Sequence, residues 1–268
     1  MFDSLKQSFP LFLYFVKLSS KETFLIFLMV SVIMYYVFFK KYRWITLLVS
    51  SLAFFFMCSQ PWLIIYVIVS AITAYFGTNY IYKCQKKEDK NIVLGIMLVI
   101  IVGILTILKY SNIIPETLNI FGNLFGINLP FGKVSILAPI GISYYTLSLI
   151  SYVIDIYRNS YEPEKNILKL VLFTCFYPVM ISGPIIRYDE IKDELFNQRV
   201  FEWNNFFIGF DRIIYGMMKK LVIADNLALY TSNVFSAYQT YSGLFIIKGV
   251  LFFALQIYCD FSGCMDIV

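Results

Sequence analysis

Long apolar runs separated by short polar segments dominate this chain. A helix needs about 20 mostly apolar residues to cross the hydrocarbon core of a bilayer, and several runs approach that length. The runs that we predict to be spans are 22–39, 44–58, 62–82, 91–109 and 136–157. A further apolar run, 243–255, leads into the last residues of the sequence. The pattern therefore predicts an all-α polytopic membrane protein.

Four other segments are not simple transmembrane spans. Residues 1–20 form a short, mildly amphipathic run that we expect to lie at the membrane interface. Residues 111–133 mix prolines and glycines with apolar residues, which fits a loop or a surface-lying or re-entrant helix. The run 167–182 either crosses or enters and returns, and 206–230 fits an amphipathic interfacial helix as well as a span. We expect about six to eight transmembrane or re-entrant helices, plus interfacial helices, in one integral membrane domain over 1–268.

The basic residues are grouped between the apolar runs. Clusters at 40–43, 83–90 and 158–169 are separated by two predicted spans each time, so all three fall on one side of the membrane. Loops rich in lysine and arginine stay on the cytoplasmic side. The pattern thus predicts a multi-pass protein with its N-terminus outside.

The composition limits which partners, metal sites and catalytic bases are expected. The chain is 59% hydrophobic and 15% charged, whereas soluble domains are about one quarter charged. The net charge of +5 comes from clusters between apolar runs, so we expect the lipid bilayer, and not nucleic acid, as a partner. Five cysteines show no CxxC spacing, and no metal site is expected. Histidine is absent, which removes the commonest general base from these 268 residues.

Two segments combine helix breakers with polar side chains. Segment 138–158 is rich in hydroxyl groups, with Tyr144 and Tyr145 near its start and Asp155 near its end. Such residues serve helix–helix packing in membranes, or they form the polar wall of a substrate path. Both interpretations stay open on the residues alone.

In segment 176–188, Gly183 and Pro184 break an apolar run shortly before Arg187. A guanidinium beside freed backbone groups can clamp a phosphate or a carboxylate. The alternative is an ordinary helix end whose charge reaches toward the interface.

The final stretch, 255–268, places carboxylates next to membrane-type helix. Charged groups at bilayer depth usually face a protein interior or a watery cavity, so Asp260, Ser262 and Gly263 are candidate site residues. Cys259 beside Asp260 suggests a nucleophile and base, but neighbours in sequence point to different sides of a helix. We expect Asp260 to organise a cavity instead. Upstream, the lysines at 219 and 220 fit a cytoplasmic boundary, or an attraction to anionic head groups or donor phosphates.

Four strings in order resemble the membrane-bound O-acyltransferases, in the bacterial branch that includes the alginate O-acetylation protein. They are PIGISYYTLSLISYVIDIYR, FYPVMISGPIIRY, KKLVIADNLA and QIYCDFSGCMDI. The earlier string KYRWITLLVSSLAFFF is also similar, so the resemblance covers about residues 20–268. The D-alanyl transfer protein of teichoic acid synthesis shares the fold and is a weaker match.

The resemblance implies an enzyme of the bacterial plasma membrane that transfers an acyl group, usually acetyl, to hydroxyls of a cell-surface polysaccharide. No bound cofactor is implied. The co-substrate would be acetyl-CoA or an acyl carrier, reaching a funnel from the cytoplasmic side. An extracytoplasmic acetyltransferase or esterase-like partner would in some cases complete the transfer to the surface glycan.

The resemblance also assigns roles to the matched residues. The catalytic histidine of the family lies downstream of the DFSG string, beyond Val268, so we expect an N-terminal fragment that is inactive alone. Asp260, Ser262 and Gly263 would shape the cavity near that histidine. The donor path would run beside Gly183, Pro184 and Arg187, and the polar wall would include Tyr144, Tyr145 and Asp155.

Two other classes of function fit the pattern less well. A transporter or flippase for a cell-envelope precursor also places charges and broken helices at the bilayer midplane, but it predicts inverted repeats, and we see none in the sequence. A structural scaffold would leave Asp260 and Arg187 without a purpose.

Overall fold

The computed structural model describes the whole chain except residues 1–20, 38–42, 112–116, 118–136, 181–182 and 198–199. Among the described residues 84% are helical and none is in a strand, which confirms the predicted all-α class. The predicted interfacial segment 1–20 and most of 111–133 lie outside the described residues.

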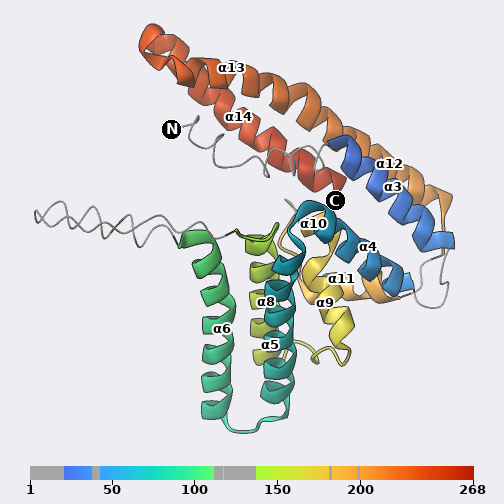
Figure 1. Ribbon diagram of the computed structural model, residues 1–268. Coiled ribbons are helices and arrows are strands. Elements are labelled where there is room, and N and C mark those ends of the chain that lie inside the picture. Colours follow the sequence, from blue (N-terminus) through green and yellow to red (C-terminus); the bar gives the residue numbers. More distant parts are fainter. Residues whose placement is uncertain (1–20, 38–42, 112–116, 118–136, 181–182, 198–199) are drawn as a thin grey trace, which may run out of the picture. The chain divides into compact units, whose positions relative to one another are not determined.

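The described residues form two compact units, each considered by itself. The first unit contains eight of the described α-helices, several of which carry the first predicted spans (Figure 1). They are α3 (Lys21–Val37), α4 (Arg43–Cys58), α5 (Ile64–Lys83), α6 (Lys87–Tyr110), α8 (Ile142–Tyr157), α9 (Ile167–Cys175), α10 (Tyr177–Met180) and α11 (Tyr188–Phe196). A 3-10 turn, η1 (Pro61–Leu63), leads into α5.

The second unit is mainly a helical hairpin. Its first arm runs through α12 (Trp203–Met217), a π-helical turn η2 (Met218–Ala224) and α13 (Asp225–Ser236). After a 3-10 turn, η3 (Tyr238–Thr240), the chain returns along α14 (Gly243–Ile267). Gly183 and Pro184 group with this unit. The prediction of one integral membrane domain stays a prediction.

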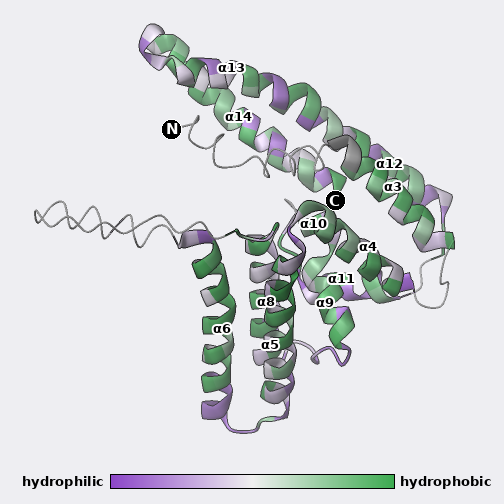
Figure 2. Cartoon of the chain, viewed as in Figure 1, coloured by the Kyte–Doolittle hydropathy of each residue, from purple (hydrophilic) through white to green (hydrophobic). Residues whose placement is uncertain are grey.

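Three described helical segments are long and apolar enough to cross a membrane. They are Pro61–Lys83, which contains α5, together with α6 and α14. Apolar side chains of α6 and α14 point away from their own units, and Figure 2 shows hydrophobic residues along both helices. Val99 of α6, for example, is 72% exposed. Such surfaces suit lipid, because no burial inside the unit accounts for them.

The core of the first unit forms where α4, α5, α8 and α9 pack together. Phe55, Val67, Leu149 and Leu170, one from each helix, are fully buried there. Burial of such large apolar side chains stabilises helix packing through close contact. This core fixes α8, the helix with the hydroxyl-rich sequence.

The predicted span 136–157 is shorter as a helix than expected. Residues 137–141 are not helical, and α8 begins at Ile142. The reason is local: Pro139 has no amide hydrogen to donate, and Gly141 has a left-handed backbone with φ of 72°.

The run 167–182 is also divided. Helix α9 ends at Cys175, Phe176 leaves the helical region, and α10 provides only one further turn. In a continuous helix the amide of residue 178 would bond to the carbonyl of Thr174, but Pro178 has no such amide. One break therefore lies at Phe176. Residues 183–187 are non-helical as well, which agrees with the break predicted at Gly183–Pro184.

Ser51 of α4 and Ser59, which directly follows α4, stabilise the backbone at two of these breaks. The amide of Tyr177 donates to Ser51 Oγ at 3.3 Å, and the amide of Ile140 donates to Ser59 Oγ at 3.1 Å. Non-helical backbone at membrane depth requires such partners, because lipid offers none. The protein thus satisfies the two donors from within.

Candidate functional site

Asp155 and Arg187 meet at one edge of the first unit. The Asp155 side chain is only 8% exposed, and its Oδ1 lies 3.5 Å from Nη2 of Arg187. Ser151, one turn earlier on α8, donates to the other carboxylate oxygen at 3.5 Å. Arg187 is 53% exposed, so its guanidinium has both a fixed partner and an open side. The structure therefore joins two predicted site residues from separate strings.

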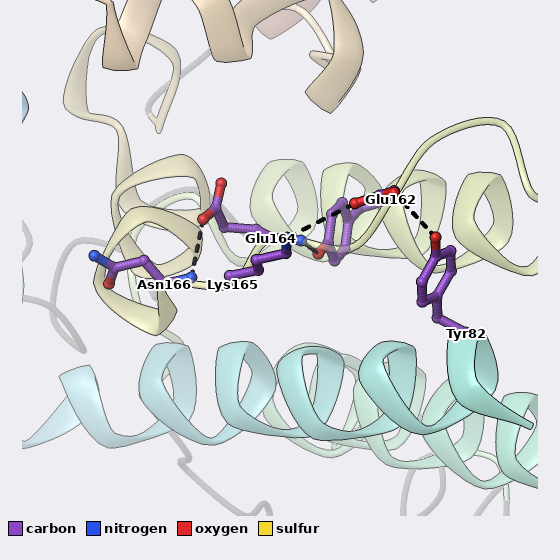
Figure 3. Close-up of polar contacts among 6 residues, drawn as sticks. Tyr82, Glu162, Glu164, Lys165 and Asn166 are labelled. Carbon is purple, nitrogen blue, oxygen red and sulfur yellow. Dashed lines mark hydrogen bonds and ion pairs between the residues drawn. The ribbon is translucent and has the colours of Figure 1, made fainter.

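A tyrosine–glutamate network lies in the same unit, and the sequence did not point to it. Tyr188 donates to Glu164 at 2.5 Å, and the amide of Glu164 donates to the hydroxyl of Tyr152 at 3.0 Å. The Glu164 carboxylate also accepts a hydrogen bond from the amide of Asn166 at 2.9 Å (Figure 3). Burial, together with the hydrogen bond to Glu164, holds the pKa of Tyr188 well above its usual range. The one hint in the sequence is a glutamate within a loop predicted to be basic.

The hydroxyl-rich start of α8 is packed inside the unit. Tyr145 is buried, whereas Tyr144 is half-buried, and both line a small pocket beside α9 and α10. Packing and a polar wall were the two open interpretations, and the structure has features of both. Further along, Gly183 is buried and Pro184 is exposed in the non-helical segment before α11.

The second unit contains its own cluster of charges. Lys219 donates to Asp266 at 2.6 Å and to Ser262 at 2.9 Å. Lys220 pairs with Asp260 and lies 3.5 Å from the sulfur of Cys264. Both ammonium groups are thus engaged by α14, which the sequence did not predict.

The π-helical turn positions these two lysines. Consecutive residues of an α-helix point in different directions, yet both side chains here reach the same helix. The wider turn of η2 and the length of the lysine stems account for this. Single π-turns within helices often occur at functional sites.

Two glycines let the hairpin arms touch. A Cβ added to Gly216 would lie 2.6 Å from the carbonyl oxygen of Gly263, and one added to Gly263 would lie 2.7 Å from that of Gly216. Backbone therefore meets backbone here, close to the lysine–carboxylate pairs. Gly263, predicted as a cavity residue, has a packing role that the structure makes plain.

We expect the Lys220–Asp260 pair to hold the hairpin together. Lys220→Asp and Asp260→Lys, each made alone, should lower the thermal stability of the protein in detergent, because like charges then face each other. The double exchange should recover part of the loss. Thermal unfolding of the four proteins forms a double-mutant cycle that measures this coupling. If the effects of the two substitutions on stability were strictly additive, Lys220 and Asp260 would not interact.

Comparison with known proteins finds similar relatives. No protein-family model matches the chain. The chain is 31% identical over 250 residues to the probable alginate O-acetylase AlgI of Pseudomonas aeruginosa. This match covers 92% of the chain and 47% of the relative. The AlgI of Azotobacter vinelandii is 30% identical over 248 residues, covering 92% of the chain and 49% of the relative.

A relative named for a different acceptor is also similar. The peptidoglycan O-acetyltransferase of Helicobacter pylori is 25% identical over 248 residues, covering 82% of the chain and 46% of the relative. The chain spans about half the length of the curated relatives it matches. These findings confirm the resemblance to the membrane-bound O-acyltransferases, in the alginate O-acetylation branch, that the four strings predicted.

Proposed function

We propose that this chain contributes to a bacterial membrane O-acetyltransferase that modifies hydroxyls of a cell-surface or secreted polysaccharide. The observation that carries the proposal is the similarity over 92% of the chain to alginate O-acetylases. A second relative is named for peptidoglycan, so the shared acceptor class is a polysaccharide hydroxyl. Asp155 of α8 and Asp260 of α14 are ion-paired carboxylates in otherwise apolar helices, and they support a site because such charges are costly to keep in a membrane.

The proposed arrangement is multi-pass in the plasma membrane with the N-terminus outside. The donor, acetyl-CoA or an acyl carrier, then approaches from the side of the basic loops. Arg187 suits a donor phosphate, because its guanidinium is half-exposed while Asp155 fixes its position. An extracytoplasmic acetyltransferase or esterase-like partner that completes the transfer belongs to the same proposal.

The chemistry needs a base that these residues do not offer. When an acceptor hydroxyl attacks the acyl carbonyl of a thioester, the new C–O bond forms, the C–S bond breaks and the hydroxyl proton must be removed. The 268 residues contain no histidine, and Lys219 and Lys220 are held by carboxylates. We therefore propose that a histidine outside these residues takes the proton, and that the residues alone do not catalyse transfer.

The test is the O-acetyl content of the surface glycan in a strain that lacks the gene. Restoring the native gene should restore acetylation. Arg187→Ala and Asp260→Ala should each lower it at least about tenfold, because a charge-assisted contact contributes about 1.5–3 kcal/mol. Lys165→Ala is the matched control, since the Lys165 side chain is 86% exposed, and it should restore acetylation fully.

Protein levels in the membrane fraction must be equal across the variants. Full acetylation with both Arg187→Ala and Asp260→Ala would remove these residues from the site. Unchanged acetylation in the deletion strain would contradict the function. If the deletion lowers the amount of exported glycan and not its acetyl content, the transporter alternative replaces the proposal.

A further inference from the structure

Arg187 and Asp155 attract each other without touching closely. The 3.5 Å between Asp155 Oδ1 and Arg187 Nη2 exceeds the length of a close charge-assisted hydrogen bond, which is about 2.7–2.9 Å. Arg187 also lies just before α11, in extended backbone with φ of −86° and ψ of 140°. Asp155 therefore sets the direction of the guanidinium, and a second contact is needed to hold the backbone that carries it.

The next residue, Tyr188, provides that contact. Tyr188 is 3% exposed, and its hydroxyl donates to Oε2 of Glu164 at 2.5 Å. Its ring packs edge-on against Tyr152 and Phe173, with centroids 5.0 and 5.2 Å away. A buried ring with a bonded hydroxyl cannot turn without losing both kinds of contact. Tyr188 thus holds the chain directly beside Arg187.

Glu164 is itself held by several contacts. Its amide donates to the hydroxyl of Tyr152 at 3.0 Å, and its Oε1 accepts from the amide of Asn166 at 2.9 Å. Since Oε2 accepts from Tyr188, both carboxylate oxygens have partners within the protein (Figure 3). These partners make Glu164 an anchor in the loop between α8 and α9.

The contacts return to the helix from which they start. Tyr152, whose hydroxyl holds Glu164, is fully buried on α8. Asp155 lies three residues further along α8, on the same side of the helix. One helix therefore supports both contacts of Arg187, the direct one from Asp155 and the indirect one through Tyr188. Packed and fully hydrogen-bonded groups of this kind make the structure around them rigid.

We propose that Tyr188 and Glu164 are positioning residues, which hold Arg187 in place to bind a phosphate of the acyl donor. This inference rests on the proposed acyltransferase function and adds residues that act on donor binding through Arg187. A guanidinium on a rigid backbone loses less conformational entropy when it binds a phosphate, so the donor binds more tightly. Acetyl-CoA and an acetylated acyl carrier protein both have a phosphate on the pantetheine arm, so either donor fits this chemistry.

The proposal is tested by the kinetics of acetyl transfer to glycan in membranes from cells that express the native gene. Acetyl-CoA is the donor in one arm and acetylated acyl carrier protein in the other, and KM is measured for the donor that the wild-type protein uses. Tyr188→Phe removes the hydroxyl and keeps the packed ring. It should raise KM about tenfold and leave kcat within about twofold, because a loosened Arg187 binds the donor more weakly before and during the reaction alike.

A second substitution separates positioning from general damage. The Arg187→Ala protein has no guanidinium to position, so adding Tyr188→Phe to it should change KM by less than about twofold. Damage to the fold would have the same effect with and without Arg187. Glu164→Gln keeps an acceptor of the same shape, so its KM should lie between those of the wild-type protein and Glu164→Ala.

Tyr82→Phe is the matched control. Tyr82, near the end of α5, also donates to a glutamate of the α8–α9 loop, to Oε1 of Glu162 at 3.1 Å (Figure 3). That pair is exposed and includes neither Tyr188 nor Glu164. Tyr82→Phe should therefore leave both KM and kcat at their wild-type values, at equal protein levels in the membrane.

Three results would overturn the inference: an unchanged KM in Tyr188→Phe, a fall in kcat alone, or the same rise in KM with and without Arg187. If Tyr188→Phe does not reach the membrane, Glu164→Gln is judged by the same comparison. If Arg187→Ala transfers no acetyl, the changes in KM and kcat of Tyr188→Phe and of the two Glu164 variants decide. Wild-type membranes that transfer acetyl from neither donor would overturn the proposed function itself.

Discussion

Gly141→Ala is expected to lower the free energy of unfolding by about 2–5 kcal/mol, as the sum of backbone strain and overpacking. Gly141 has a φ of 72°, which L-residues rarely adopt, and an added methyl would overlap the carbonyl oxygen of Met180. Neither the backbone of α10 nor the start of α8 can move far, because Ser51 and Ser59 bind the amides beside them. Denaturant unfolding of the protein in detergent measures the loss.

A glycine in an open helix provides the control. Gly103 lies within α6, and a Cβ added there would meet nothing within 4 Å. Gly103→Ala should therefore leave stability unchanged or raise it by up to about 1 kcal/mol, since alanine favours helix. Equal stability of the Gly141→Ala and Gly103→Ala proteins would show that the α8–α10 contact is not as tight as described.

Gly263→Ala should force the arms of the second unit apart. The added methyl would come within 2.7 Å of the carbonyl oxygen of Gly216, and backbone atoms cannot rotate out of the way as a side chain would. We expect a loss of about 1–3 kcal/mol in unfolding free energy. The lysine–carboxylate pairs beside this contact should loosen too, so acyl transfer should fall together with stability.

Gly209→Ala on α12 is the matched control for the hairpin. It lies on the same arm as Gly216, and a Cβ there would meet nothing within 4 Å. Its stability and transfer activity should equal those of the wild-type protein or exceed them slightly. A Gly263→Ala protein with wild-type stability and activity would mean that the arms have room at this point.

The helices of this chain could be predicted from its apolar runs. Helices α3 to α6 follow the predicted spans closely, because a continuous apolar run bounded by polar residues leaves few alternatives. The breaks could be predicted only in part. Pro139 and Gly141 mark the start of α8 in the sequence. The break at Phe176, which depends on Pro178, was not predicted, because the Gly183–Pro184 pair accounts for the break expected in this run.

The contacts of the candidate site were much harder to predict. Asp155, Arg187 and Asp260 stand out in the sequence as charges in apolar surroundings, and in the structure each has a charged partner that the sequence did not predict. The identity of those partners depends on tertiary packing. Lys220 reaches Asp260 only because a π-helical turn and a glycine contact bring the two arms together, and neither feature has a sequence signature.

The central proposal is tested most directly by transfer of radiolabelled acetyl groups to glycan in isolated membranes. Membranes from cells with and without the native gene receive labelled acetyl donor on the cytoplasmic side, and alkali-labile label on the glycan is counted. We predict that labelling requires the chain and falls at least about tenfold with Arg187→Ala, whereas Lys165→Ala leaves it unchanged. Equal labelling of glycan in membranes that lack the chain would contradict the proposal.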